Sequence, residues 1–152
     1  MTATRVHPRY HSCMADAAHS LLTGLRHLLL AHHKTLLDSE RARYDHDVER
    51  IKSSGQLLNL VLRDPFFAWL HELSELIVLI DETLDADEPA TAAEAARLLA
   101  QARTLLTPAE AGQGFRGQYF DALQRDPDVV IAHGAAVKAM ATLEADGREK
   151  AE

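Results

Sequence analysis

The chain has 152 residues, the size of one ordinary domain, and at that length a core can form without a metal or a disulfide. Hydrophobic residues make up 47% and charged residues 26% of the sequence, which excludes disorder as a description of the whole chain. The formal net charge of −7 argues against a nucleic-acid partner, because such a surface repels phosphate groups.

The indicators of compartment favour a soluble, cytoplasmic protein. The only cysteine, Cys13, cannot build a disulfide framework, which favours a reducing compartment and an inert thiol. No run of about 18 apolar residues occurs, so we expect neither a membrane span nor a membrane partner. Near the N-terminus, Asp16 and His19 interrupt the apolar stretch that a signal peptide would need.

Residues 1–11 contain Pro8 and show no apolar period, so we expect a flexible tail there. A long helix is predicted over 12–51, and the charges between Glu40 and Arg50 are typical of a salt-bridged helix face. Its apolar stripe lies in one narrow arc in the first half and then shifts, which indicates a bend or a second packing partner. The stripe consists of Met14, Ala18, Leu21, Leu22, Leu25, Leu28, Leu29, His32 and Leu36, and later of Leu37, Tyr44, Val48 and Ile51.

Two capping patterns predict where the next helices begin. Ser54 is a candidate N-cap for a short helix over 56–63. The pair Asp64-Pro65 then predicts a helix over 65–84, because Asp is a good N-cap and Pro suits the first helical position. This helix is apolar nearly all round, so we expect it to be the central one. Three of its apolar residues fall outside its core stripe: Phe67, Val78 and Leu79.

Thr91 and Glu94 match a capping box, which predicts a helix over 92–106. The alanines of this helix allow a close approach to its neighbours. A glycine-punctuated loop over 112–117 and a short helix over 119–125 should follow.

The pair Asp126-Pro127 repeats the earlier start signal and predicts a last helix over 127–144, followed by a polar tail over 145–152. Strand signals are nearly absent, and the connections between helices are short. The sequence therefore predicts an all-α, single-domain protein over 12–144, built as an antiparallel four-helix bundle with one or two extra short helices.

Two histidines lie on predicted apolar faces, His32 on the first long helix and His133 on the last. If both point inward they could hold a metal ion or a haem, since bundles build such sites from facing core positions. The structural alternative is that each is a buried histidine hydrogen-bonded to a neighbour. We expect this alternative, and no cofactor, and keep the two residues as the candidates for cofactor binding.

Other candidate metal ligands are paired by their spacing. His7 and His11 are four residues apart, as are His71 and Glu75, and a helix would place each pair on one face. The first pair falls in the predicted tail, and Glu75 of the second pair falls on the polar side of its helix, where a solvated face is the better explanation.

Carboxylates supply a catalytic hypothesis. Asp81 lies at the edge of the apolar arc beside Glu82, and we expect it to pair with Arg63 or Arg125. The alternative is an acid with a shifted pKa in a cleft, in a small enzyme that would use Asp81, Glu82 or His71.

Motifs that would identify a reaction are missing from the sequence. A di-iron site would need two Glu-x-x-His pairs, and the nearest match is Asp16-x-x-His19. A phosphate-binding glycine loop, a nucleophile elbow, Cys-x-x-Cys and His-Glu-x-x-His are all absent. We therefore lean against an enzyme.

Two segments carry a resemblance to known sequences: 56–82, with RDPFFAWL at its centre, and 127–133, PDVVIAH. They resemble a family of uncharacterised bacterial hypothetical proteins, and the resemblance covers most of the chain. It implies an all-helical protein and carries over no activity and no functional residue.

The function that we expect is protein–protein interaction or self-association. Phe67, Val78 and Leu79 give more apolar surface than four antiparallel helices need, and a contiguous exposed patch of this kind marks an interface. A homodimer is the simplest form, because closed two-fold dimers are the commonest oligomers. The rivals are a metal- or haem-binding bundle and the small enzyme described above.

Overall fold

The computed structural model describes the backbone of residues 8–151 and the side chains of residues 13–150. Throughout that range the chain forms helices and no strands, so the predicted all-α class is confirmed. The elements are α1 (Pro8–Asp47), α2 (Ser54–Arg63), the 3-10 helix η1 (Ala68–Leu70), α3 (His71–Asp85), α4 (Ala92–Leu105), α5 (Gly114–Arg125) and α6 (Pro127–Ala151). None of the described helices has the length and apolar character required to cross a membrane.

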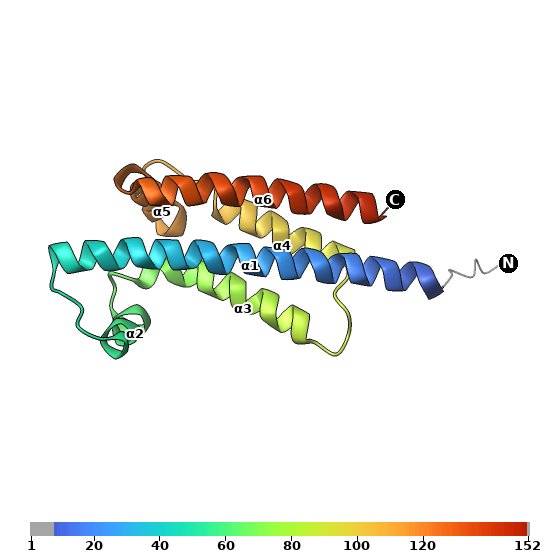
Figure 1. Cartoon of the computed structure of the whole chain (residues 1–152), viewed down its shortest axis with the longest axis horizontal. Coiled ribbons are helices and arrows are strands. Elements are labelled where there is room, and N and C mark those ends of the chain that lie inside the picture. Colours follow the sequence, from blue (N-terminus) through green and yellow to red (C-terminus); the bar gives the residue numbers. More distant parts are fainter. Residues whose placement is uncertain (1–7, 152) are drawn as a thin grey trace.

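The central element is α1, because α3, α4 and α6 all pack against it. Figure 1 shows these four helices reversing direction one after another, with α4 and α6 on one side of α1 and α3 on the other. The short helices α2 and α5 lie at the end of the bundle where α1 ends. The expectation that the helix over 65–84 is central is wrong, since Val78 and Leu79 of α3 are 52% and 40% exposed.

The sequence of α1 explains its position. Buried residues recur every three or four positions along it, which keeps them on one face of a helix. They are Ala18, Leu22, Leu25, Leu29, His32, Leu36, Glu40 and Tyr44, with Ser39 also buried beside Glu40.

Both ends of α1 differ from the prediction. The helix begins at Pro8, inside the expected tail, where a proline suits the first turn because its missing N–H needs no partner. It ends at Asp47 rather than near Ile51, and the backbone N–H of Ile51 donates to Asp45 Oδ1 at 2.7 Å. Val48, a predicted stripe member, is consequently 57% exposed. At the other end of the chain, α6 continues to Ala151 through the expected polar tail.

The connection from α2 to α3 corrects two predicted starts. Ser53, rather than Ser54, caps α2, and its hydroxyl accepts from the Gln56 N–H. The Asp64 carboxylate accepts from the Phe66 N–H at 2.8 Å, but this bond closes a turn, and α3 begins only at His71. Because α3 begins later than predicted, Phe67 lies in the turn, and its ring is fully buried in the core.

The later start signals agree better with the structure. Thr91 and Glu94 form the predicted capping box of α4, and α6 begins at Pro127 as predicted. However, α5 begins at Gly114, inside the predicted loop, at a φ of 71° that favours glycine. Gly117 is required as well, because a Cβ there would lie 1.8 Å from the Gly112 carbonyl oxygen.

Candidate functional site

The two histidines singled out from the sequence meet in the bundle core through a tyrosine. His32 of α1 is 3% exposed, and its Nε2 lies 2.9 Å from the hydroxyl of Tyr119. Nδ1 of His133, on α6, lies 2.7 Å from the same hydroxyl. The fully buried Tyr119 comes from α5, so the three side chains join three helices.

The direction of the hydrogen bonds that link His32, Tyr119 and His133 follows from their donors and acceptors. The hydroxyl has one proton, so it donates to one histidine and accepts from the other. Nδ1 of His32 has no hydrogen-bond partner, and a buried N–H without a partner is rarer than a buried acceptor without one. We therefore assign the proton of His32 to Nε2, which donates to Tyr119, and the tyrosine donates to Nδ1 of His133.

Burial keeps all three groups neutral near pH 7. It lowers the pKa of His32 to about 4, with smaller contributions from repulsion by His133 and His33. Burial also lowers the pKa of His133 and raises that of the Tyr119 hydroxyl. Burial lowers the pKa of His33 as well, and its Nε2 lies 2.9 Å from the Ser74 hydroxyl.

This geometry bears on the metal and haem hypothesis. The two imidazole nitrogens that face each other are both hydrogen-bonded to the Tyr119 hydroxyl, which occupies the space between them. Among the described side chains, no group of three His, Cys, Asp or Glu residues is arranged to hold a metal ion. His32 and His133 are therefore brought together as predicted, in the hydrogen-bonded arrangement that was the structural alternative.

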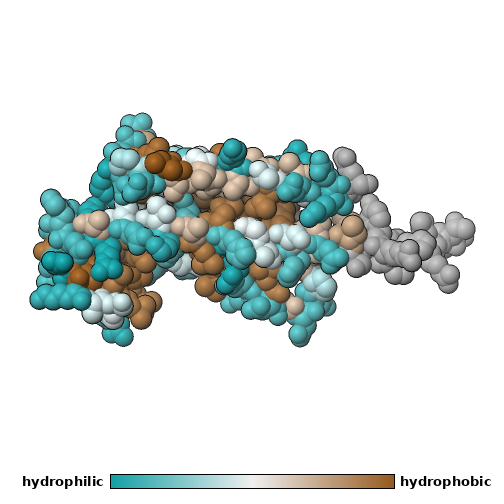
Figure 2. Space-filling model, viewed as in Figure 1, coloured by the Kyte–Doolittle hydropathy of each residue, from teal (hydrophilic) through white to brown (hydrophobic). Residues whose placement is uncertain are grey.

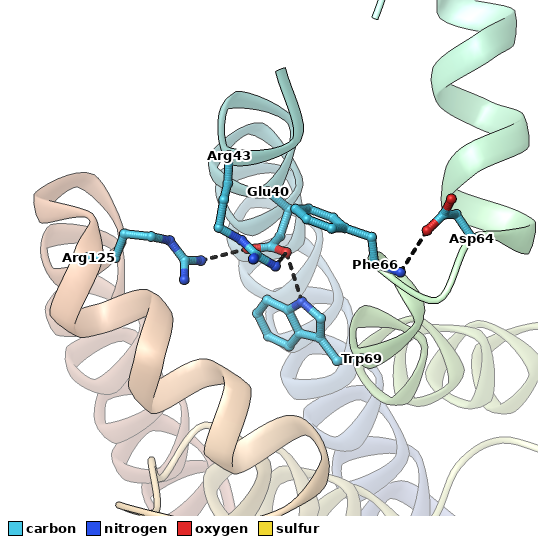
Figure 3. Close-up of polar contacts among 6 residues, drawn as sticks. All are labelled: Glu40, Arg43, Asp64, Phe66, Trp69 and Arg125. Carbon is cyan, nitrogen blue, oxygen red and sulfur yellow. Dashed lines mark hydrogen bonds and ion pairs between the residues drawn. The ribbon is translucent and has the colours of Figure 1, made fainter. Parts of the chain in front are cut away.

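A second buried polar cluster surrounds Glu40, which is 1% exposed. Figure 3 shows Arg43 of α1, Arg125 of α5 and Trp69 of η1 converging on its carboxylate. Arg43 approaches through Nη2 at 2.8 Å and Nε at 3.2 Å, Arg125 through Nη2 at 2.6 Å, and the Trp69 indole N–H at 3.1 Å. The Arg43 guanidinium also lies 3.9 Å from the centre of the Phe66 ring.

The Glu40 cluster is a structural clamp. Each carboxylate oxygen accepts two hydrogen bonds, which uses the roughly four acceptor positions of the group. A carboxylate without a free acceptor position has none to offer to a substrate proton. The predicted salt bridging is present between Glu40 and Arg43, but Glu40 itself is buried, because the residues that cover it come from distant parts of the sequence.

The geometry does not support the candidate metal pair His71 and Glu75, and it does not test the pair His7 and His11. His71 Nε2 donates to the Val61 carbonyl oxygen at 2.9 Å, and Glu75 is exposed. His7 lies outside the described residues, and so does the side chain of His11. Asp16-x-x-His19, the nearest match to a di-iron motif, faces solvent at both residues.

The carboxylate that was a catalytic candidate is paired with an unexpected residue. Asp81 forms an ion pair with Arg26 of α1, rather than with Arg63 or Arg125, and both side chains are more than a third exposed. Glu82 is exposed. The sequence did not reveal Arg26 because it lies 55 residues away on another helix.

Tyr119 and Trp69 are the residues that the sequence interpretation missed. Phe115, Tyr119 and Ala122 are buried on one side of α5, at helical spacing, but the first of these lay in the predicted loop. A longer predicted helix would have indicated an inward-facing tyrosine.

The outer surface of α6 is apolar over a long stretch, and α2 shares this feature on a smaller scale, with Leu58 and Leu62 exposed. Residues 129–142 contain Lys138 as their only charged residue. Val130, Ile131 and Val137 are 48%, 71% and 47% exposed. Together with the exposed small residues between them, they form what we call the α6 face: Val130, Ile131, Gly134, Ala135, Val137 and Ala141. Figure 2 shows dark brown, apolar surface over the first turns of α6.

Comparison with known proteins finds no match: no family model fits the chain, and no curated protein or solved structure is significantly similar to it. The resemblance to bacterial hypothetical proteins stays a prediction.

Proposed function

We propose that this protein acts by self-association, and that two copies pair through the α6 face. The observation that carries the proposal is the exposure of Val130, Ile131 and Val137 on a stretch of helix with one charged residue. An exposed helix normally has a polar outer face, and contiguous apolar surface on a protein marks an interaction site.

Gly134 supports a close approach by a second helix. It lies in the interior of α6, where glycine is less stable than alanine by roughly 0.5–1 kcal/mol. A Cβ added there meets nothing within 4 Å, so packing inside the chain does not require a glycine. A second helix that crosses α6 at this point would explain why the residue is a glycine.

Charge favours a second copy as the occupant. If two α6 helices cross antiparallel at Gly134, Lys138 of one copy is level with Val130 of the other. Asp128 then lies about 3 Å further along the axis, within reach of the lysine ammonium group. Neither Lys138 nor Asp128 takes part in an ion pair among the described side chains, so both are available. Because the dimer is two-fold symmetric, the ion pair between Lys138 and Asp128 would occur twice.

The α6 face alone is too small for a stable dimer. A helix is about 10 Å wide, and a stable interface buries about 800 Å² on each partner. The adjacent surface of α1 can complete it, since Leu28, Ala31 and Thr35 line a shallow groove along α6. The groove is otherwise lined by alanines of α6 and by His32.

Sedimentation equilibrium of the full chain tests the proposal. We expect the wild-type protein to form dimers, and Ile131→Lys to weaken dimerisation by about a hundredfold or more, because the new ammonium group would be buried beside Lys138 of the other copy. The matched control is Val78→Lys, which introduces the same charge at an exposed valine of α3 and should leave the dimer intact. A wild-type protein that stays monomeric, or equal weakening by both variants, would refute pairing through α6.

Gly134→Ala gives a second test with two readouts. We expect the change to raise the melting temperature of the monomeric Ile131→Lys background, because alanine favours helix. In the otherwise wild-type chain it should weaken dimerisation. A variant that stabilises the fold and leaves the dimer unchanged would show that no helix approaches Gly134.

A further inference from the structure

A cavity of about 380 Å³ lies between α1, α4 and α6, near the N-terminus of α1. Its size is within the roughly 300–1,000 Å³ range of pockets that hold small molecules. Alanine is the commonest residue in its lining, so we call it the alanine groove. Its apolar wall consists of Met14, Ala17, Ala18, Leu21, Ala92, Ala95, Ala96, Leu99 and Ala100.

The groove follows from the sequence of the helices around it. On α4, Ala92, Ala95, Ala96, Leu99 and Ala100 recur at helical spacing; Ala95 and Leu99 are buried, whereas Ala92, Ala96 and Ala100 lie at the exposed edge of the groove. Methyl groups there leave the space between three helices unfilled. The wall extends along α4 from Ala92 to Arg103, a rise of about 16 Å, which suits an extended chain rather than a ring system.

Charged side chains are confined to one part of the wall. Glu144 of α6 bonds Arg103 Nη2 at 2.5 Å and Arg148 Nη2 at 2.6 Å. Two guanidinium groups therefore share one carboxylate, which leaves an excess positive charge beside an apolar cavity. All three side chains are between 32% and 77% exposed, so they can rearrange to receive a further anion.

We propose that the alanine groove binds a free fatty acid, with the hydrocarbon chain along α4 and the carboxylate at Arg103 and Arg148. The net charge of −7 opposes general anion binding, so affinity for a carboxylate must come from these two guanidinium groups. The groove lies C-terminal to the α6 face on α6, and the proposal does not depend on self-association.

Isothermal titration calorimetry with monomeric dodecanoate tests the proposal on the full chain. We expect saturable binding of one dodecanoate per chain, and binding of the neutral dodecan-1-ol that is weaker by about tenfold or more, because it lacks the charge-assisted bonds. Arg103→Gln should weaken dodecanoate and leave dodecanol unchanged. No binding, or equal affinity for the acid and the alcohol, would overturn the proposal.

Matched substitutions on α4 locate the ligand. Ala96→Trp should fill the groove and abolish binding, whereas Ala93→Trp, an exposed alanine outside the lining, should bind as the wild type does. Circular dichroism checks that both variants fold. Equal binding by the two variants would place the ligand elsewhere. If Ala96→Trp alters the mass of the protein in solution and leaves dodecanoate binding unchanged, the groove is a protein interface and the proposal fails.

Discussion

The two ends of the bundle are built from different residues. At the end near α2 and α5, the rings of Tyr44, Phe66 and Phe67 contact one another, and Trp69 contacts Phe115. We call this the aromatic end. The opposite, alanine end is formed by residues 13–25, 92–102 and 140–150, which include no Phe, Tyr or Trp. Large rings with polar partners fill space and fix orientation, whereas alanines allow close approach and leave a groove.

The difference indicates which end we expect to determine the stability of the fold and which end carries the proposed ligand site. The Glu40 clamp and the His32–Tyr119–His133 chain join helices at or near the aromatic end. The alanine end contains the groove, whose charged residues are partly exposed. We therefore expect substitutions at the aromatic end to affect folding, and substitutions around the alanine groove to affect ligand binding.

The largest expected effect is the loss of a ring at the aromatic end. Phe67→Ala should lower the free energy of unfolding by about 3–5 kcal/mol, because Phe67 is fully buried and leaves a cavity. Leu99→Ala, at the alanine end, should cost only about 2 kcal/mol, since Leu99 already borders the groove. Urea unfolding measures both values. Equal losses would contradict the difference between the two ends.

Acid should destabilise the protein through the histidine chain. The folded pKa of His32, about 4, lies below its value of 6.5 in the unfolded chain, so protons bind the unfolded state first. Stability should fall as the pH drops from 6.5 to 4, by roughly 3 kcal/mol from His32 alone. Burial lowers the pKa values of His33 and His133 as well, which adds to the loss.

Urea unfolding at several pH values between 7 and 4 would measure this loss. His32→Gln keeps a group that can bond to Tyr119 and cannot titrate, so it should flatten the pH dependence. A wild-type protein whose stability is constant over this range would show that His32 is not buried in solution.

The Glu40 clamp gives a smaller effect. Glu40→Gln keeps an acceptor for Trp69 but removes the charge shared by Arg43 and Arg125, so we expect a loss of about 2 kcal/mol. The matched control is Asp38→Asn on the same helix, whose pair with Lys34 is exposed and should contribute under about 0.5 kcal/mol. Thermal unfolding of the two variants compares them directly, and a control loss as large as that of Glu40→Gln would remove the distinction.

The smallest expected effect is at the alanine groove. Ala96→Leu adds apolar volume to the groove and should raise the free energy of unfolding by about 0.5–1 kcal/mol. Ala93→Leu, which points to solvent, should change it little. A clear loss in Ala96→Leu, measured by urea unfolding, would mean that the groove is already filled in solution.

Local signals in the sequence predicted local structure well. The capping box of Thr91 and Glu94 and the start at Pro127 are set by neighbouring residues, and both predictions are confirmed. The periodicity of α1 also placed His32 in the core.

Contacts between distant segments could not be predicted in the same way. The burial of Glu40 could not be predicted because the residues that cover it come from η1 and α5. Phe67 fell outside the predicted stripe because it lies in the turn before α3, where its ring packs against Tyr44 of α1. The choice of Arg26 as the partner of Asp81 depends on how α1 and α3 pack, which periodicity does not encode.

Disulfide trapping at Gly134 tests pairing through the α6 face most directly. In a Cys13→Ser background, Gly134→Cys would place two thiols on the proposed two-fold axis, where helices about 8–10 Å apart bring the Cα atoms within disulfide range. Gly55→Cys is the control, because Gly55 is also exposed with open space around it. We predict rapid formation of a covalent dimer by Gly134→Cys and little by Gly55→Cys. Equal rates for the two variants would contradict the proposal.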